Sequence, residues 1–181
     1  VGDVVFINDA EKISRFFEMI QKEIKIRKAK LSEYNGDYEL YKKTSKEKMP
    51  TIIVEMNSYE TFAEIYQSKY DDLFITLTRE CVTVGIIFVL SVSNYSDMRY
   101  RLNQNFKKKI ALQLNKDDDY MCVFEKAKKK RPSSLFGRGL VCVEKDEVLE
   151  FQTAKICNAE QYNLFIKETV EELNKKHMEK A

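Results

Sequence analysis

The chain has 181 residues, of which 44% are apolar and 33% are charged, and its net charge at pH 7 is +2. This composition is typical of a globular protein with its own core, and the charge is too small to indicate binding to nucleic acid or to an anionic membrane. The four cysteines are scattered and there is one histidine, so we expect buried, reduced thiols and no zinc site. Because the sequence begins with Val1 and not with methionine, we expect it to be a piece of a longer protein.

The first half of the chain alternates between helical and extended patterns. Residues 1–7 form a strand or an extended lead-in, and Asn8 or Asp9 can cap a long amphipathic helix that ends near Leu31. The polar stretch 33–48 contains Gly36 and predicts a loop or a loop with one broken turn. Residues 50–56 (PTIIVEM) are almost continuously apolar, which predicts a strand buried on both faces. Two short helices, 59–66 and 71–84, and a second buried strand, 86–93, are expected to follow.

The second half predicts a short helix at 94–106, a strand at 108–115, a helix at 116–127 and a loop at 131–139. Residues 140–144 and 147–156 predict a β-hairpin. Asn158 then caps a last amphipathic helix, and we expect its apolar residues to face inward: Tyr162, Phe165, Ile166, Val170 and Leu173. Buried strands separated by helices predict an α/β fold, a mostly parallel sheet with helices on both faces and an antiparallel hairpin at its C-terminal edge. We expect a single domain, residues 1–181.

Two features needed for nucleotide hydrolysis on such a sheet are missing from the sequence. The first is a Gly-rich phosphate loop that ends in Lys-Ser or Lys-Thr, and none of the five glycines stands at that spacing. The second is an acidic residue at the end of a buried strand, where this chain has Asn57 and Ser58. Neither side chain supplies the negative charge that Mg²⁺ prefers. Glu55 is either a displaced acid or a carboxylate in a solvated or paired position, and the second alternative is favoured, so we expect no catalytic residue here.

The order of these segments resembles the second half of a RecA-like P-loop ATPase domain of the FtsK/SpoIIIE family, with the phosphate-loop region missing. The resemblance covers nearly the whole chain and rests on five stretches: EIKIRKAKL (23–31), MPTIIVEMNSYETF (49–62), TLTRECVTVGIIFVLSVSN (76–94), NQNFKKKIALQL (103–114) and GRGLV (137–141). Residues 99–120 (RYRLNQNFKKKIALQLNKDDDY) and 136–154 (FGRGLVCVEKDEVLEFQTA) are especially similar to the last ATPase domain of the type VII secretion coupling proteins, the EssC/EccC type. Asn57 and Ser58 replace the acids of this family, and Ser93 replaces its polar sensor.

The resemblance implies a non-hydrolytic or regulatory ATPase-like domain of a type VII secretion motor. Such motors are membrane-anchored hexamers, so it implies a place at the cytoplasmic face of the bacterial membrane, with the membrane contacted only by parts outside this chain. The implied partners are other ATPase domains, neighbouring subunits and secreted substrates. No cofactor is expected. The alternative is an active translocase of protein or DNA that uses ATP and Mg²⁺ and whose phosphate loop lies outside this chain.

Two arginines and two basic clusters have alternative interpretations. Arg79 reaches a phosphate in a neighbouring subunit or forms a surface ion pair, and Arg138, between two glycines, contacts an anion or partner or belongs to a flexible lead-in to a strand. The clusters 105–109 and 126–132 could bind a nucleic-acid backbone. The acids at 117–119 lie between them and favour a solvated surface, so nucleic acid is not an expected partner. Tyr59, Phe62, Ile65 and Tyr66 are either core residues or the lining of a groove for a partner helix.

Overall fold

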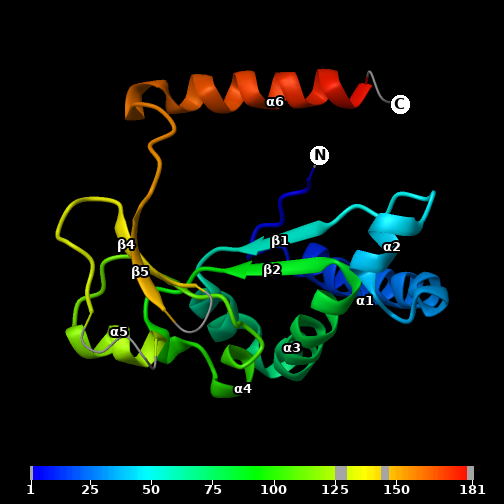
Figure 1. Cartoon of the computed structure of the whole chain (residues 1–181), viewed down its shortest axis with the longest axis horizontal. Helices are drawn as coiled ribbons and strands as arrows, with labels where there is room; N and C mark the ends of the chain where they lie inside the picture. The colour runs from blue at the N-terminus through cyan, green and yellow to red at the C-terminus, as the bar shows by residue number, and fades with distance from the viewer. Residues whose placement is uncertain (1, 125–129, 144–146, 179–181) are drawn as a thin grey trace. The chain divides into compact units, whose positions relative to one another are not determined.

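Figure 1 shows the computed structural model of the chain, which describes residues 2–124, 130–143 and 147–178. Contacts divide the chain into two compact units, one of residues 5–108 and one of residues 1–4 and 109–181. Each unit is an α/β arrangement of helices with a small sheet, parallel in the first and antiparallel in the second. That the two units form one domain stays a prediction.

The unit of residues 5–108 is built on two parallel strands. The strands β1 (Ile52–Met56) and β2 (Ile86–Leu90) pair in register from Ile52 with Ile86 to Met56 with Leu90. The helix α3 (Tyr59–Cys81) connects them, as a parallel pair requires. The remaining helices are α1 (Ala10–Leu31), α2 (Tyr38–Thr44) and the short α4 (Tyr100–Asn103). Residues 2–6, where a strand or an extended lead-in was expected, have no regular structure.

Helix α1 confirms the sequence prediction. It begins after Asp9, whose carboxylate accepts a hydrogen bond of 3.0 Å from the backbone N–H of Lys12 and so satisfies one of the unpaired donors of the first turn. Of the predicted apolar stripe, Phe16 is half-buried and the other members are buried: Ile13, Phe17, Ile20, Ile24 and Leu31. Between its turns and those of α3 lies an aromatic cluster in which the ring of Phe17 stacks on Tyr70 at 4.4 Å and meets Phe74 edge-on at 6.2 Å.

The two helices predicted at 59–66 and 71–84 are one helix, α3. The connecting residues contain no glycine or proline that would end a helix. Their apolar neighbours continue at helical spacing, so one continuous face is buried: Tyr59, Phe62, Tyr70, Phe74 and Leu77. This confirms the core interpretation of Tyr59 and Phe62, whereas Ile65 is exposed and Tyr66 donates a hydrogen bond of 2.8 Å to the carbonyl of Ile7.

The two parallel strands are covered on one face only, which differs from the prediction of strands buried on both faces with helices on each side. Ile86 and Phe88 are buried toward the core, whereas Ile53, Ile87 and Val89 are exposed on the opposite face, Ile53 by 68%. Helices α1 and α3 lie on the same side of the strand pair (Figure 1). A continuous apolar run predicts that both faces of a strand are covered. It does not say which element covers each face.

A second difference is α2, which lies in the stretch predicted as a loop. Asp37 caps this helix by accepting a hydrogen bond of 3.0 Å from the N–H of Leu40. Tyr38 and Tyr41 are buried on one side of it, while lysines and Glu39 face solvent. Only two of its seven side chains are buried. The charged residues around them hide the helical spacing of apolar residues in the sequence.

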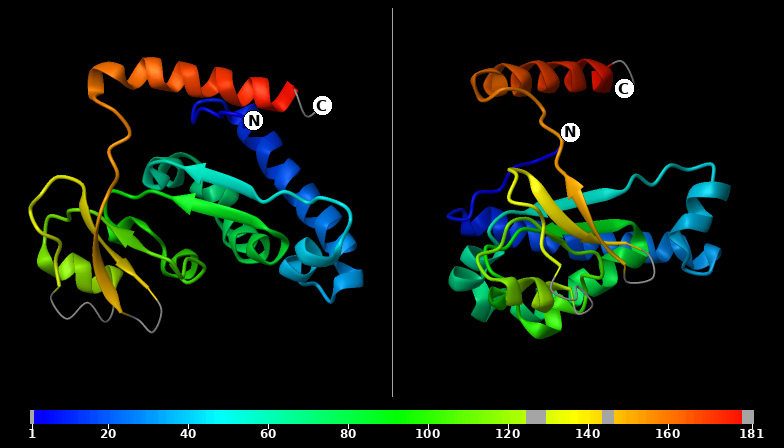
Figure 2. Two further views of the ribbon diagram at one scale, coloured as in Figure 1. Left: turned by 45° about the horizontal axis from the view of Figure 1, so that its top comes forward. Right: turned by 60° about the vertical axis from the view of Figure 1, so that its left-hand side comes forward.

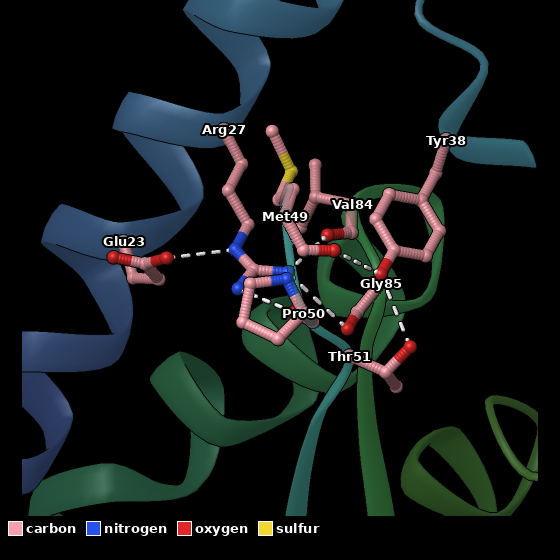
Figure 3. A network of polar contacts seen from close by, with 8 residues as sticks. All are labelled: Glu23, Arg27, Tyr38, Met49, Pro50, Thr51, Val84 and Gly85. Carbon is pink, nitrogen blue, oxygen red and sulfur yellow. Dashed lines mark hydrogen bonds and ion pairs between the residues drawn. The ribbon is translucent and has the colours of Figure 1, made fainter. Parts of the chain in front are cut away.

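A buried arginine joins α1 to the beginnings of both strands (Figure 3). Arg27 is only 2% exposed. Its guanidinium donates to the carbonyls of Val84 at 3.0 Å and Pro50 at 2.8 Å, and its Nε lies 2.7 Å from the carboxylate of Glu23, one turn earlier on α1. The planar fork of the guanidinium satisfies several acceptors that would otherwise be buried without a donor.

The second unit contains an antiparallel sheet of three strands, shown from two further directions in Figure 2. Its strands are β3 (Ile110–Ala111), β4 (Arg138–Cys142) and β5 (Val148–Gln152), and its helices are α5 (Asp117–Val123) and α6 (Tyr162–Met178). The predicted hairpin is confirmed as β4 and β5, while the predicted strand at 108–115 is reduced to two residues and pairs antiparallel with β4. The hairpin turn at 144–146 and residues 125–129, which include most of the second basic cluster, lie outside the described residues.

The apolar side of the last helix is exposed, whereas it was predicted to face inward. Asn158 precedes a 3-10 turn, Ala159–Gln161, without a side-chain capping hydrogen bond, and α6 begins at Tyr162. The residues expected to face inward are exposed: Tyr162, Phe165, Ile166, Val170 and Leu173. The amphipathic pattern was therefore predicted correctly, but the part of the chain that the structure describes does not bury it. None of the described helices is long and apolar enough to cross a membrane.

The cysteines differ in exposure, and this supplies a test of the core. Cys81 is buried, Cys142 and Cys157 are half-buried and Cys122 is exposed, so the expectation of four buried thiols is correct only for Cys81. Burial, followed by the charge of Glu80, raises the pKa of the Cys81 thiol to about 12.

We expect iodoacetamide at pH 8 to modify Cys122 rapidly and to leave Cys81 unmodified in the folded protein, as measured by peptide mass spectrometry. A thiol in the unfolded chain ionises at about pH 8.5. Because the pKa of Cys81 is raised in the folded protein, the free energy of unfolding falls as the pH increases from the pKa of the unfolded thiol to about 12. The variant Cys81→Ala should show a shallower fall over that range. Equal labelling of Cys81 and Cys122 in the native state would contradict this burial.

Candidate functional site: a polar corner at the ends of the parallel strands

The carboxyl ends of β1 and β2 meet because the strands are parallel and in register. This brings together two of the sequence-predicted groups, Asn57 and Ser58 after β1 and Ser93 after β2. It adds two residues that the sequence did not single out, Ser91 and Glu60. We call these five residues the polar corner. In open α/β sheets, this is the edge at which ligands bind.

Ser91 ties the two strand ends together. Its N–H donates to the carbonyl of Met56 at 3.0 Å, and its hydroxyl oxygen accepts from the N–H of Ser58 at 2.9 Å. The same hydroxyl donates to Oδ1 of Asn57 at 3.3 Å, and the carbonyl of Ser91 accepts from the N–H of Tyr59 at 2.9 Å. The amide of Asn57 thus takes part in a hydrogen-bond network within the chain.

Ser58 has a left-handed backbone, with φ of 52° and ψ of 60°. For a residue with a side chain this conformation costs on the order of 1 kcal/mol. Ser58 stands at the N-cap of α3, yet its side chain makes no capping hydrogen bond. Its conformation instead directs the backbone N–H to Ser91, so that the chain turns sharply from β1 into α3.

Glu60 is the one carboxylate of the polar corner. It lies in the first turn of α3, where the helix dipole favours a negative charge, and its Oε1 accepts from the hydroxyl of Ser93 at 2.6 Å. Its Oε2 is buried, with no hydrogen-bond partner among the described residues. The sequence could have indicated Glu60 by its position two residues after Ser58, just beyond the place where the family carries its acids.

The polar corner offers hydroxyl and amide oxygens, backbone groups and one carboxylate. A divalent hard cation is usually held by several anionic oxygens. Among residues 2–124, 130–143 and 147–178 there is no group of three or more His, Cys, Asp or Glu side chains placed to hold a metal ion. Glu55 is exposed on the open face of β1, as the solvated alternative predicts. The chemistry available at the polar corner is therefore hydrogen bonding around a single negative charge.

Of the two predicted arginines, Arg79 belongs to the same unit as the polar corner and Arg138 belongs to the other unit. Arg79 is exposed in the last turn of α3, whereas Asn57 and Ser58 precede its first turn. The helix has 23 residues and is therefore roughly 35 Å long. Arg138 begins β4 in the other unit, with its Nε 3.8 Å from the carboxylate of Glu150. Their roles toward an anion or a neighbouring subunit stay predictions.

No family model matches the chain. Among curated proteins, it is 24% identical over 178 residues to the type VII secretion system protein EssC of Staphylococcus aureus strain MRSA252, covering 96% of this chain and 12% of that protein. It is 28% identical over 110 residues to the ESX secretion system protein EccC of Geobacillus thermodenitrificans, covering 60% of this chain and 7% of that protein. The chain thus spans a small part of these curated relatives.

Solved structures share the fold. "EssC (ATPases 2 and 3)" from Geobacillus thermodenitrificans matches 95% of this chain and 33% of its own with a TM-score of 0.77 and 21% identity. "The cytoplasmic domain of EssC" matches 95% of this chain and 34% of its own with a TM-score of 0.71 and 22% identity. The ATPγS-bound monomer form of the conjugation coupling protein TcpA matches 94% of this chain and 50% of its own with a TM-score of 0.69 and 19% identity.

Proposed function

We propose that this chain, a homologue of the ATPase domains of EssC and EccC type VII secretion proteins, is a regulatory domain of such a coupling ATPase and does not hydrolyse ATP. The observation that carries the proposal is the neutral end of β1 in the polar corner. The strand end that delivers acids in the family delivers Asn57 and Ser58, and their polar groups are engaged with Ser91. The role of the domain is then to contact other ATPase domains, neighbouring subunits or secreted substrates.

The finer fold follows from the same resemblance. We propose a RecA-like domain in which β1 and β2 are the strands that carry the acids and the polar sensor, with the phosphate-loop region supplied by sequence outside this chain. Two matched structures are described as cytoplasmic domains of EssC or EccC, which supports a place for this chain on the cytoplasmic side of the membrane. Assembly as a hexamer belongs to this proposal.

The test compares two variants of the polar corner in the multidomain coupling ATPase that this proposal requires. Asn57→Ala and Glu60→Gln remove the two groups best placed to stand in for the missing acids. If the domain is non-hydrolytic, both variants should keep the steady-state ATPase rate within about twofold, because any turnover comes from other domains. Loss of a group that activates water costs on the order of 100-fold in a working site.

The control for these variants is Glu64→Gln, which removes an exposed carboxylate one turn further along α3. A large loss of ATPase rate in Asn57→Ala or Glu60→Gln, but not in Glu64→Gln, would overturn the proposal. Isothermal titration of the 181-residue chain with ATP is the companion measurement. We expect no Mg²⁺-dependent heat, because the polar corner has one carboxylate and the sequence lacks a phosphate loop.

One observation favours a second candidate, an active translocase completed by an upstream phosphate loop. Glu60 is a carboxylate of the polar corner with one buried oxygen, and it is hydrogen-bonded to the residue in the sensor position, Ser93. This candidate requires a Gly-x-x-x-x-Gly-Lys-Ser/Thr sequence before Val1 and Mg²⁺-dependent nucleotide binding that Glu60→Gln abolishes. The sequence preceding Val1 distinguishes the two candidates directly.

A further inference from the structure

We draw no further inference here: the strongest candidate, the surface loop of residues 133–137, which is hydrogen-bonded to Glu150 and Gln152 of the antiparallel sheet and carries Phe136 at 98% exposure, carries no proposal because nothing in the structure shows what covers that ring.

Discussion

Replacing Arg27 with leucine is expected to lower the free energy of unfolding by about 2–4 kcal/mol. The substitution removes the donor of the buried carbonyl of Val84 and of the partly buried carbonyl of Pro50. A buried acceptor left without its donor costs about 1–3 kcal/mol, and the carbonyl of Pro50 adds a smaller cost because water reaches it in part. Denaturant unfolding followed by circular dichroism measures the change.

The control for Arg27→Leu is Arg15→Leu. Both arginines lie on α1 and both pair with a glutamate one turn earlier, Glu23 or Glu11, but Arg15 is exposed. An exposed pair of this kind contributes about 0.3–0.5 kcal/mol. The two variants should therefore differ by several-fold in their effect. Similar small losses for both would show that Arg27 does not hold the strand starts together.

Replacing Gly85 with alanine is expected to destabilise the protein by about 2–4 kcal/mol, from overpacking and an unfavourable backbone conformation together. Gly85 has φ of 74°, and a Cβ there would lie 2.3 Å from the ring of Tyr38. That ring cannot move aside freely, because the Tyr38 hydroxyl donates to the carbonyl of Met49 at 2.9 Å and lies 3.0 Å from Oγ1 of Thr51.

Gly36→Ala separates the two contributions to this loss. Gly36 has nearly the same φ, 72°, but an added Cβ would meet nothing within 4 Å. Its replacement should cost only the backbone component, about 1 kcal/mol. The difference in free energy of unfolding between the two variants measures the contact with Tyr38. Equal losses at both positions would mean that the ring of Tyr38 gives way.

Sequence patterns predicted a helix or strand best where a local signal and the burial of its side chains agree. The cap at Asp9 and the stripe from Ile13 to Leu31 define α1 without tertiary information, and β4 and β5 pair as the hairpin pattern predicts. The coverage of a strand is different, because it depends on other elements. Ile53 and Ile87 were predicted to be buried but are exposed, since α1 and α3 lie on one side of the strands.

The polar corner was predicted in part. Asn57 and Ser58 were identified at the end of an apolar strand, and Ser93 was identified from the resemblance to the family's sensor position. The parallel register brings the two strand ends together. Ser91 was missed because its role is to bond backbone groups of the neighbouring strand, which depends on register and not on residue type. Glu60 was missed because a glutamate in the first turn of a helix is common in sequences where it has only a helix-dipole role.

The contacts of Arg27 have a consequence for sequence divergence. Apart from Glu23, its acceptors are peptide oxygens, so the side chains at positions 50 and 84 can change without loss of those bonds. Only the arginine itself is specified. Distant relatives could therefore drift almost completely at the start of both strands and still keep the same attachment between helix and sheet, provided one guanidinium persists at this turn of the first helix.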